Sequence, residues 1–303
     1  MCSCLSPCDT STLYVVLPYF NFCKFKTREK LFIDFVKRYA CTPGVQLVVV
    51  EDGRSLPVLP VFKHIRLNYK DKIWIKENMI NIAIGQLPEG WRYVAWVDAD
   101  ITFLNKRWPQ ETVQMLETHD AVQMFHTAVN MGPTGEVIKV DKSFGFMHDK
   151  SGTQYSKSDK YGFWHPGYGW AVRREAWDRM GGLVDWAILG SGDRHMALAF
   201  IGKVMDSAPG NIHSNYKAML KEYQIACKGF KVSCITGTIV HHFHGSLENR
   251  KYKDRWDILT KLKFDPFEDI CFKGSQLELT KEGKRFKEDI LRYFQERKED
   301  SSA

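Results

Sequence analysis

The sequence predicts an α/β protein whose mixed, mostly parallel sheet is flanked by helices. Two observations predict this class. Short apolar strands alternate with amphipathic helices over roughly the first hundred residues, and each strand ends in acidic or turn-forming residues. Strands that are apolar on both faces and joined through helices are typical of parallel sheets covered on both sides.

The elements follow in the order that such a sheet requires. Strands are predicted at 13–17, 46–50, 64–67, 93–97 and 231–240. Helices are predicted around 31–39 and at 73–87, 175–180, 190–200, 252–262 and 281–297. Residues 126–165 lack periodicity, so a long loop or an irregular hairpin is expected there, and loops of that length are usually functional.

Composition narrows the class of protein. A hydrophobic content of 44% supports a substantial core, and the net charge of +7 suits an anionic ligand without indicating nucleic acid. The eight cysteines have no repeated spacing, so we expect free thiols, including Cys2, Cys4 and Cys8. The sequence has no secretory signal and no apolar run of the roughly 20 residues that span a bilayer, which predicts a cytoplasmic protein without membrane contact.

Two aspartates, Asp98 and Asp100, follow the buried strand at 93–97. Open α/β sheets bind ligands at the carboxyl ends of their strands, and alternation places both carboxylates on one side of the chain. Both can therefore face one hard divalent cation, Mn²⁺ or Mg²⁺, which would most simply hold a diphosphate. Acidic pairs of this kind are also common at strand ends as solvated turn residues without a function.

Three histidines lie at the end of the strand predicted at 231–240, in the segment His241-His242-Phe243-His244-Gly245. In an extended chain, His242 and His244 share a face, and one of them could complete the metal site of the aspartates. His244 is preferred because it precedes the glycine.

Asp193 follows a Gly-Ser-Gly turn at a predicted helix start. Its carboxylate suits either an N-cap or a general base that takes a proton from an acceptor hydroxyl, and the residues leave both roles open.

Two further segments have candidate ligand contacts. Around Gly169 and Trp170, glycines permit close approach of the backbone and aromatic rings offer stacking surfaces, although an ordinary loop before a helix has the same pattern. After the histidines, basic and aromatic residues suit phosphate neutralisation or a solvated helix face; they are Arg250, Lys251, Tyr252 and Arg255.

With these pieces in this order, the chain resembles nucleotide-sugar glycosyltransferases of the GT-A fold. The resemblance is carried by Asp98/Asp100, Gly167–Arg174, Gly181-Gly182 with Asp193, and His242/His244, and it spans Thr12 to Lys263. It implies that Asp98 and Asp100 bind the metal and the sugar diphosphate. It also implies that Asp52 or Glu51 contacts the nucleobase of a UDP-sugar. Asp193 would be the general base of an inverting transfer.

On this resemblance, residues 1–11 are a flexible start and residues 12–263 form the transferase domain, followed by a helical extension at 264–303. Within the domain, 12–105 would be the nucleotide-binding half and 106–263 the acceptor and metal half.

The acceptor is predicted from a second resemblance. The ending formed by His242, His244, Gly245, Arg250, Tyr252 and Arg255 is similar to phage-type and base-J-type glycosyltransferases, which implies a hydroxymethylated pyrimidine in DNA as acceptor. The basic segment Lys139–Lys160 would then close over the polyanion. A surface glycan is the alternative acceptor, and a sugar- or nucleic-acid-binding module without catalysis is the alternative class. The oligomeric state is left open.

Overall fold

A seven-stranded sheet with the order β10-β6-β9-β4-β1-β2-β3 forms the centre of the structure. The structure is a computed structural model that describes residues 11–157, 164–246, 248–251 and 254–300. Neighbouring strands are parallel except that β9 runs antiparallel to β4 and β6. The strands are β1 (Leu13–Tyr19), β2 (Val45–Asp52), β3 (Lys63–Leu67), β4 (Tyr93–Val97), β6 (Ala121–Gln123), β9 (Gly169–Arg173) and β10 (Val232–Cys234). The predicted mixed, mostly parallel sheet is therefore confirmed.

A four-stranded sheet with the order β5-β11-β7-β8 lies beside it. Its strands are β5 (Ile101–Phe103), β7 (Thr127–Met131), β8 (Val137–Lys142) and β11 (Thr238–His241). The single strand predicted at 231–240 is divided between the two sheets, because Gly237 adopts a φ of 109° that L side chains rarely reach. The hairpin of β7 and β8 occupies part of the segment expected to be a loop or an irregular hairpin.

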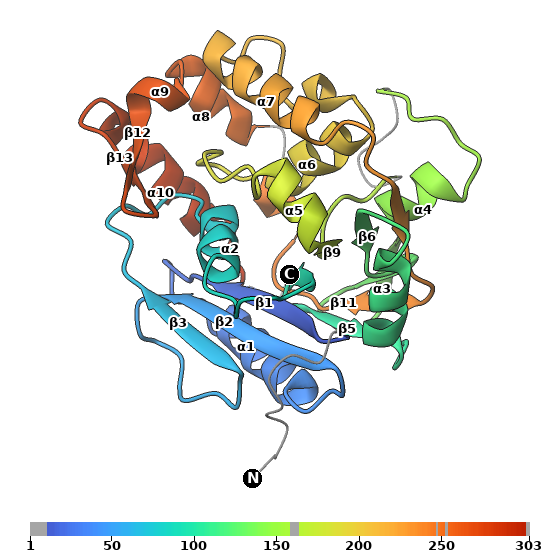
Figure 1. The fold of residues 1–303 in the computed structure, drawn as a ribbon. Coiled ribbons are helices and arrows are strands. Elements are labelled where there is room, and N and C mark those ends of the chain that lie inside the picture. The colour runs from blue at the N-terminus through green and yellow to red at the C-terminus, as the bar shows by residue number, and fades with distance from the viewer. Residues whose placement is uncertain (1–10, 158–163, 247, 252–253, 301–303) are drawn as a thin grey trace.

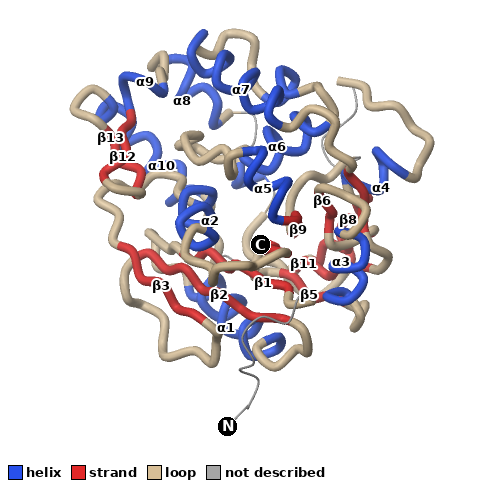
Figure 2. The backbone as a smooth tube through the Cα atoms, viewed as in Figure 1, coloured by secondary structure: helices blue, strands red, loops and turns tan. Residues whose placement is uncertain are grey.

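Helices cover both faces of the large sheet, with α1 and α2 on opposite sides of β1 and β2 (Figure 1). The strands of these two sheets lie mostly in the lower half of Figure 2, with most of the helices above them. The helices are α1 (Lys26–Tyr39), α2 (Lys76–Ile84), α3 (Trp108–Leu116), α4 (Phe144–Asp149), α5 (Arg174–Met180), α6 (Gly192–Phe200), α7 (Ser214–Ala226), α8 (Arg255–Lys261), α9 (Pro266–Asp269) and α10 (Lys287–Glu296).

Alternation along β1 builds two cores. Tyr14 and Val16 face the cluster that contains α2, whereas Val15 and Leu17 face the cluster that contains α1. Each fully buried valine or leucine contributes about 1.5–3 kcal/mol relative to an exposed one. A strand with both faces buried in this way fixes the position of the residues at its carboxyl end.

The carboxyl end of the chain packs on the same core as the large sheet. The segment predicted as a helical extension contains α9 and α10 and also a hairpin of β12 (Ile270–Lys273) and β13 (Gln276–Leu279). Beyond α10, the Asp300 carboxylate accepts hydrogen bonds from the backbone N–H groups of Lys26 and Thr27, at 2.9 and 2.8 Å. It thereby caps α1, whose own N-cap residue supplies no side-chain bond.

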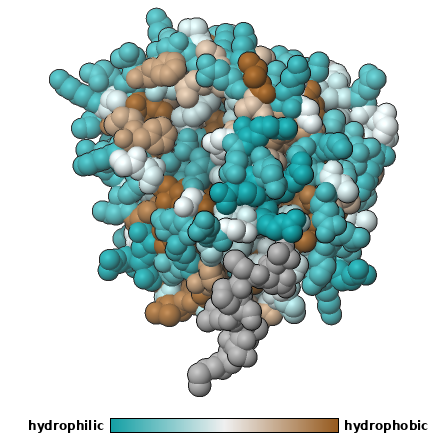
Figure 3. Space-filling model, viewed as in Figure 1, coloured by the Kyte–Doolittle hydropathy of each residue, from teal (hydrophilic) through white to brown (hydrophobic). Residues whose placement is uncertain are grey.

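Hydrophilic residues predominate on the face in Figure 3, where apolar residues lie in separate small groups. Across the part of the chain that the structure describes, no helix has both the length and the apolar character that crossing a bilayer requires.

Candidate active site

A cavity of about 960 Å³ opens where the carboxyl ends of β1 and β4 face the first turns of α2 and α6. Its walls come from segments far apart in the sequence, including the turn after β11 and the chain beyond α10. The charged and histidine side chains that line it are Arg28, Lys76, Asp98, Asp100, Lys139, Asp141, Lys157, His165, Asp193, Arg194, Asp206, His244, Arg250, Arg255, Asp257 and Arg297.

Asp100, His241 and His244 form a candidate metal site whose ligand atoms all lie within 4.8 Å of one another. The Oδ2 atom of Asp100 is 2.7 Å from Nε2 of His244 and 3.8 Å from Nε2 of His241. The antiparallel pairing of β11 with β5 places His241 opposite Ile101, beside Asp100. The chain then turns at Gly245, whose φ is 90°, and this turn keeps His244 in the site.

The surroundings of this cluster suit a bound cation. Burial would raise the pKa of Asp100, but the two histidines hold it well below its usual range, and burial lowers the pKa of His241. The Oδ1 atom of Asp100 is buried without a hydrogen-bond partner among the described residues. An unpartnered buried carboxylate oxygen beside two imidazoles fits a divalent metal.

Two predicted metal ligands lie outside this cluster. The Asp98 carboxylate lines the cavity and pairs with Lys76 at 2.7 Å. Nε2 of His242 is instead 2.7 Å from Oγ1 of Thr102, because the chain is still bonded to β5 at this point through the His242 N–H and the Asp100 carbonyl. The structure therefore groups His244 with His241, and the expected common face of His242 and His244 does not form.

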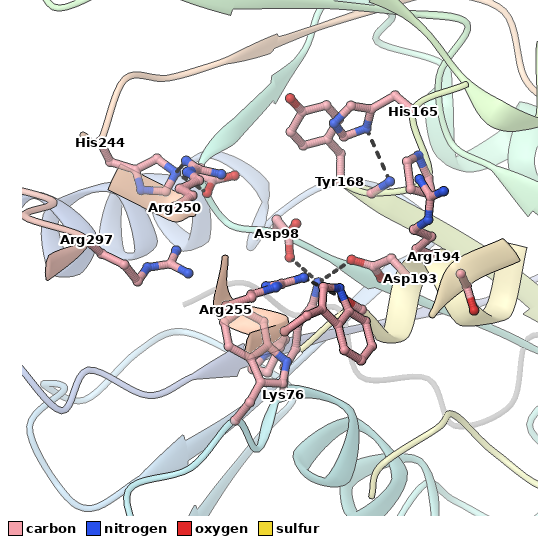
Figure 4. A pocket seen from close by; sticks show the side chains of 18 of the residues that line it. Lys76, Asp98, His165, Tyr168, Asp193, Arg194, His244, Arg250, Arg255 and Arg297 are labelled. Atoms are coloured by element: carbon pink, nitrogen blue, oxygen red, sulfur yellow. Dashed lines mark hydrogen bonds and ion pairs between the residues drawn. The ribbon is translucent and has the colours of Figure 1, made fainter. Parts of the chain in front are cut away.

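Lys76 joins the two aspartates at the centre of the cavity (Figure 4). Its ammonium lies 2.7 Å from Asp98 and 3.2 Å from Asp193, and only 8% of the residue is exposed. Burial opposes this charge, yet the two aspartates raise the pKa of Lys76 on balance. Burial also raises the pKa of Asp193, against the opposing effect of Lys76. The sequence offers no signal for Lys76, which falls inside an apparently ordinary amphipathic helix.

Asp193 is in the first turn of α6, where the N-cap position belongs to Ser191 and not to Asp193. The helix start therefore leaves the Asp193 carboxylate to face Lys76 and the cavity. This placement matches what a general base requires, and the role itself remains a prediction.

Four of the arginines that line the cavity come from α1, from the segment after β11 and from the end of the chain: Arg28, Arg250, Arg255 and Arg297. The buried carboxylate of Glu299 pairs with Arg28 at 2.9 Å and with Arg297 at 2.7 Å. Figure 4 shows Arg250 and Arg297 beside His244, and Arg255 nearer to Lys76. The sequence pattern indicated Arg250 and Arg255, but Arg28 and Arg297 are brought there only by the packing of α1 against the end of the chain.

The other predicted basic and aromatic contacts are differently placed. Lys251 pairs with Glu296 at 2.7 Å on the surface, and Tyr252 lies outside the described residues. Gly169 and Trp170 are buried within β9, where the Trp170 indole N–H donates to the Pro166 carbonyl at 2.7 Å.

The residues just before β9 reach the cavity instead. His165 and Tyr168 line it as a stacked pair, with ring centroids 4.1 Å apart. Burial lowers the pKa of His165 to about 3, so this ring is neutral at physiological pH.

Glu51 and Asp52 bind their own neighbourhood. The Glu51 carboxylate accepts from the Leu56 N–H at 2.7 Å and lies 2.9 Å from Nε2 of His64. Asp52 accepts from the Tyr69 N–H at 2.9 Å, and burial raises its pKa. Neither residue is among the described residues that line the cavity, and their contact with a base stays a prediction.

No family model and no curated protein sequence matches the chain. Similar solved structures include a mutant of Drosophila β1,4-galactosyltransferase 7 in complex with manganese, UDP-Gal and xylobiose, at 15% identity over 76% of this chain and 70% of that chain, with a TM-score of 0.37. A second is the mannosyltransferase PcManGT from Pyrobaculum calidifontis in complex with GDP-Man and Mn²⁺. It is 14% identical over 83% of this chain and 62% of that chain, with a TM-score of 0.43. The chain spans 61% of the length of the Drosophila catalytic domain solved with xylobiose, which is 16% identical over 65% of this chain with a TM-score of 0.34. Similarities of this size assign no activity to the chain.

Proposed function

We propose that the chain is a metal-dependent glycosyltransferase that moves a sugar from a nucleotide-sugar to an acceptor hydroxyl. One observation carries the proposal: a single cavity combines the Asp100–His244 side of the candidate metal site, four arginines and the separate carboxylate of Asp193. Transfer from a diphosphate donor needs positive charge at the leaving group and an acceptor for the hydroxyl proton. The arrangement supplies residues for each need in one place.

The metal would be held by Asp100, His241 and His244. Two imidazole nitrogens beside one carboxylate favour Mn²⁺ over Mg²⁺, because Mg²⁺ prefers oxygen ligands and keeps several waters. When bound, the metal would supply charge neutralisation to the departing diphosphate. Asp98 lies outside this cluster and pairs with Lys76, but it lines the same cavity, so we propose that it contacts the donor and does not bind the metal.

The arginines are proposed to bind the diphosphate. Arg28 and Arg297 share the carboxylate of Glu299, so this side of the cavity has more positive than negative charge. Arginine suits phosphate oxygens because its guanidinium presents several N–H donors in one plane. Tyr19 and Phe32 line the cavity beside Arg28 and offer apolar faces for a base, for which we propose uracil.

Asp193 is proposed as the base of an inverting transfer. Its raised pKa makes it a better proton acceptor than an ordinary aspartate, and Lys76 keeps it ionised until a substrate hydroxyl arrives. The proton of the hydroxyl would pass to the Asp193 carboxylate as the oxygen attacks the anomeric carbon. The bond from that carbon to the diphosphate oxygen breaks in the same displacement.

For the acceptor, the cavity favours a saccharide over a hydroxymethylated pyrimidine in DNA. Trp74, Trp256 and the His165–Tyr168 pair line it with aromatic faces suited to a sugar ring. In the segment expected to close over DNA, the described lysines are bonded within the chain: Lys139 to Asp141, Lys142 to Thr127, Lys150 to the Cys234 carbonyl and Lys157 to Asp206. Lys160 lies outside the described residues. The cytoplasmic location stays a prediction.

Isothermal titration of UDP-sugars with and without Mn²⁺ tests the proposal, with the Asp100→Asn variant as the control for the metal. We expect binding that depends on Mn²⁺ and is lost in the variant. Incubation with free saccharides and with DNA that contains hydroxymethylcytosine or hydroxymethyluracil, followed by mass spectrometry, identifies the acceptor. Release of UDP supports transfer, whereas no binding of any nucleotide-sugar with Mn²⁺ present overturns the proposal. Release of pyrophosphate when a nucleoside triphosphate and a sugar phosphate are supplied instead would indicate nucleotidyl transfer and overturn it as well.

A further inference from the structure

The side-chain amide of Asn130 has one possible orientation. Its nitrogen donates to Oδ2 of Asp141 at 3.0 Å, and the Asp141 carboxylate is paired with Lys139 at 2.8 Å. A carboxylate accepts hydrogen bonds, so the Asn130 nitrogen and not its oxygen must face Asp141. The amide is 3% exposed and cannot turn without leaving a buried polar group unpaired.

This orientation determines the proton position on His241. Oδ1 of Asn130 accepts the Tyr168 hydroxyl at 2.6 Å and lies 3.0 Å from Nδ1 of His241. Because an amide oxygen only accepts, Nδ1 of His241 carries the proton. The Nε2 lone pair of the neutral ring is then directed at Asp100 and His244.

His244 has a corresponding outer residue at the end of the chain. Its Nε2 lies 2.7 Å from Oδ2 of Asp100 and 2.7 Å from Nη2 of Arg250, and its buried Nδ1 has no hydrogen-bond partner among the described residues. The nearest carboxylate oxygen recorded for that nitrogen is Oε2 of Glu299, at 3.7 Å. Glu299 is 2% exposed, and the backbone of the segment from Arg297 to Glu299 packs directly against Gly245.

We propose that Asn130 and Glu299 are positioning residues that orient the two imidazole rings from outside, so that both Nε2 atoms face Asp100, the side on which a metal would bind. The inference rests on the proposed metal site and extends it to an amide on β7 and a carboxylate after α10. Outer oxygens of this kind commonly select the tautomer of a ligating histidine, and their loss costs about 10–100-fold in metal affinity.

The first test is the tautomer of His241 in the metal-free wild-type protein, measured by long-range ¹H–¹⁵N NMR on ¹⁵N-histidine-labelled material. We expect protonation at Nδ1, and a change in that pattern in Asn130→Leu. A proton on Nε2 of His241 in the wild type overturns the proposal, whether or not the protein transfers sugars. The measurement needs neither metal nor nucleotide-sugar, so it is independent of the proposed function.

The second test is Mn²⁺ affinity, measured by titration with detection of free Mn²⁺ by EPR. We expect Kd to rise about 10–100-fold in Asn130→Leu and about tenfold in Glu299→Gln. Asn81→Leu is the control for loss of a hydrogen-bonded amide, because the half-buried Asn81 bonds to Leu183 and Asp185 and is not among the residues that line the cavity. Glu296→Gln is the control for charge, because Glu296 is paired with Lys251 on the surface at the same end of the chain.

Thermal unfolding of each variant identifies loss of the fold. Folded Asn130→Leu and Glu299→Gln proteins that bind Mn²⁺ as tightly as their controls would overturn the positioning role. Should Asn130→Leu not fold, Glu299→Gln and the wild-type NMR measurement decide the question. A wild type that binds no Mn²⁺ would overturn the proposed metal site, and the NMR measurement would still test the orientation of His241.

Discussion

Two groups of charged residues share the cavity, and they differ in how their charges are balanced. Asp98 and Asp193 receive a cation from the chain itself, the ammonium of Lys76. Around Asp100, the Nε2 atoms of His241 and His244 converge on one carboxylate, whose other oxygen is buried and unpartnered among the described residues.

The difference indicates where a metal belongs. A cluster that already contains a buried lysine gains little from a second cation, because the two positive charges would repel each other. The Asp100 cluster has no buried lysine among the described residues. Its neighbouring cation is Arg250, whose guanidinium lies 2.7 Å from Nε2 of His244 and would have to release that nitrogen for a metal to bind. The predicted acidic pair is therefore divided, with Asp100 in the candidate metal site and Asp98 paired with Lys76.

The largest effect is expected from Asp100→Asn. We expect Mn²⁺ binding to be lost and kcat/KM to fall on the order of a thousandfold or more, because the leaving diphosphate loses its charge neutralisation. Asp98→Asn should leave Mn²⁺ affinity within about threefold of wild type, since that carboxylate is not an outer residue of the metal site. Titration with Mn²⁺ checks both variants, and equal losses in the two would contradict the division.

The next effect is expected from Asp193→Ala. Loss of a general base typically lowers kcat by about 10²–10⁴-fold, and donor binding should be nearly unchanged. Steady-state kinetics and titration with UDP separate the two quantities. NMR of the product anomer tests inversion, and substantial activity in Asp193→Asn would place the base elsewhere.

The histidines separate the structural assignment from the sequence-based one. His241→Ala and His244→Ala should each weaken Mn²⁺ binding, by more than the roughly 10–100-fold expected for an outer residue. His242→Ala should change it by less than about threefold, because that ring bonds to Thr102 and lies outside the cluster. A loss in His242→Ala equal to that in His241→Ala would restore the pairing of His242 with His244.

The smallest effect concerns stability on the lysine side. Burial raises the pKa of Glu77, against the effect of Lys76, from its ordinary 4.5 to about 8. The folded protein therefore holds a proton that the unfolded chain releases, so this stability is complete below pH 4.5 and is lost as the pH rises towards 8. The free energy of unfolding should fall by up to about 1.4 kcal/mol per pH unit in that window. Denaturant titrations at several pH values should show a shallower dependence in Glu77→Gln, and identical slopes would refute the raised pKa.

The sequence by itself determined the α/β class and the carboxyl-end position of the acidic pair, because both follow from local patterns. A short run of bulky, β-prone residues such as Tyr93–Val97 predicts a buried strand, and the residues after it are then expected at the carboxyl edge of the sheet. The Gly-rich turn before Asp193 and the histidine cluster were also visible as short motifs. Each motif identified a side chain of the candidate site, or one within a few residues of it in the sequence.

Only the tertiary structure decided which of those side chains meet. The division of the predicted strand at Gly237 placed β11 beside β5, and this pairing selected His241 in place of His242. Lys76 and Asn130 have no local signal, because their roles depend on contacts with residues far away in the sequence, at Asp193 and His241. Alternation within a strand states which side chains share a face, but the partner strand, the turn and the returning end of the chain determine what that face contacts.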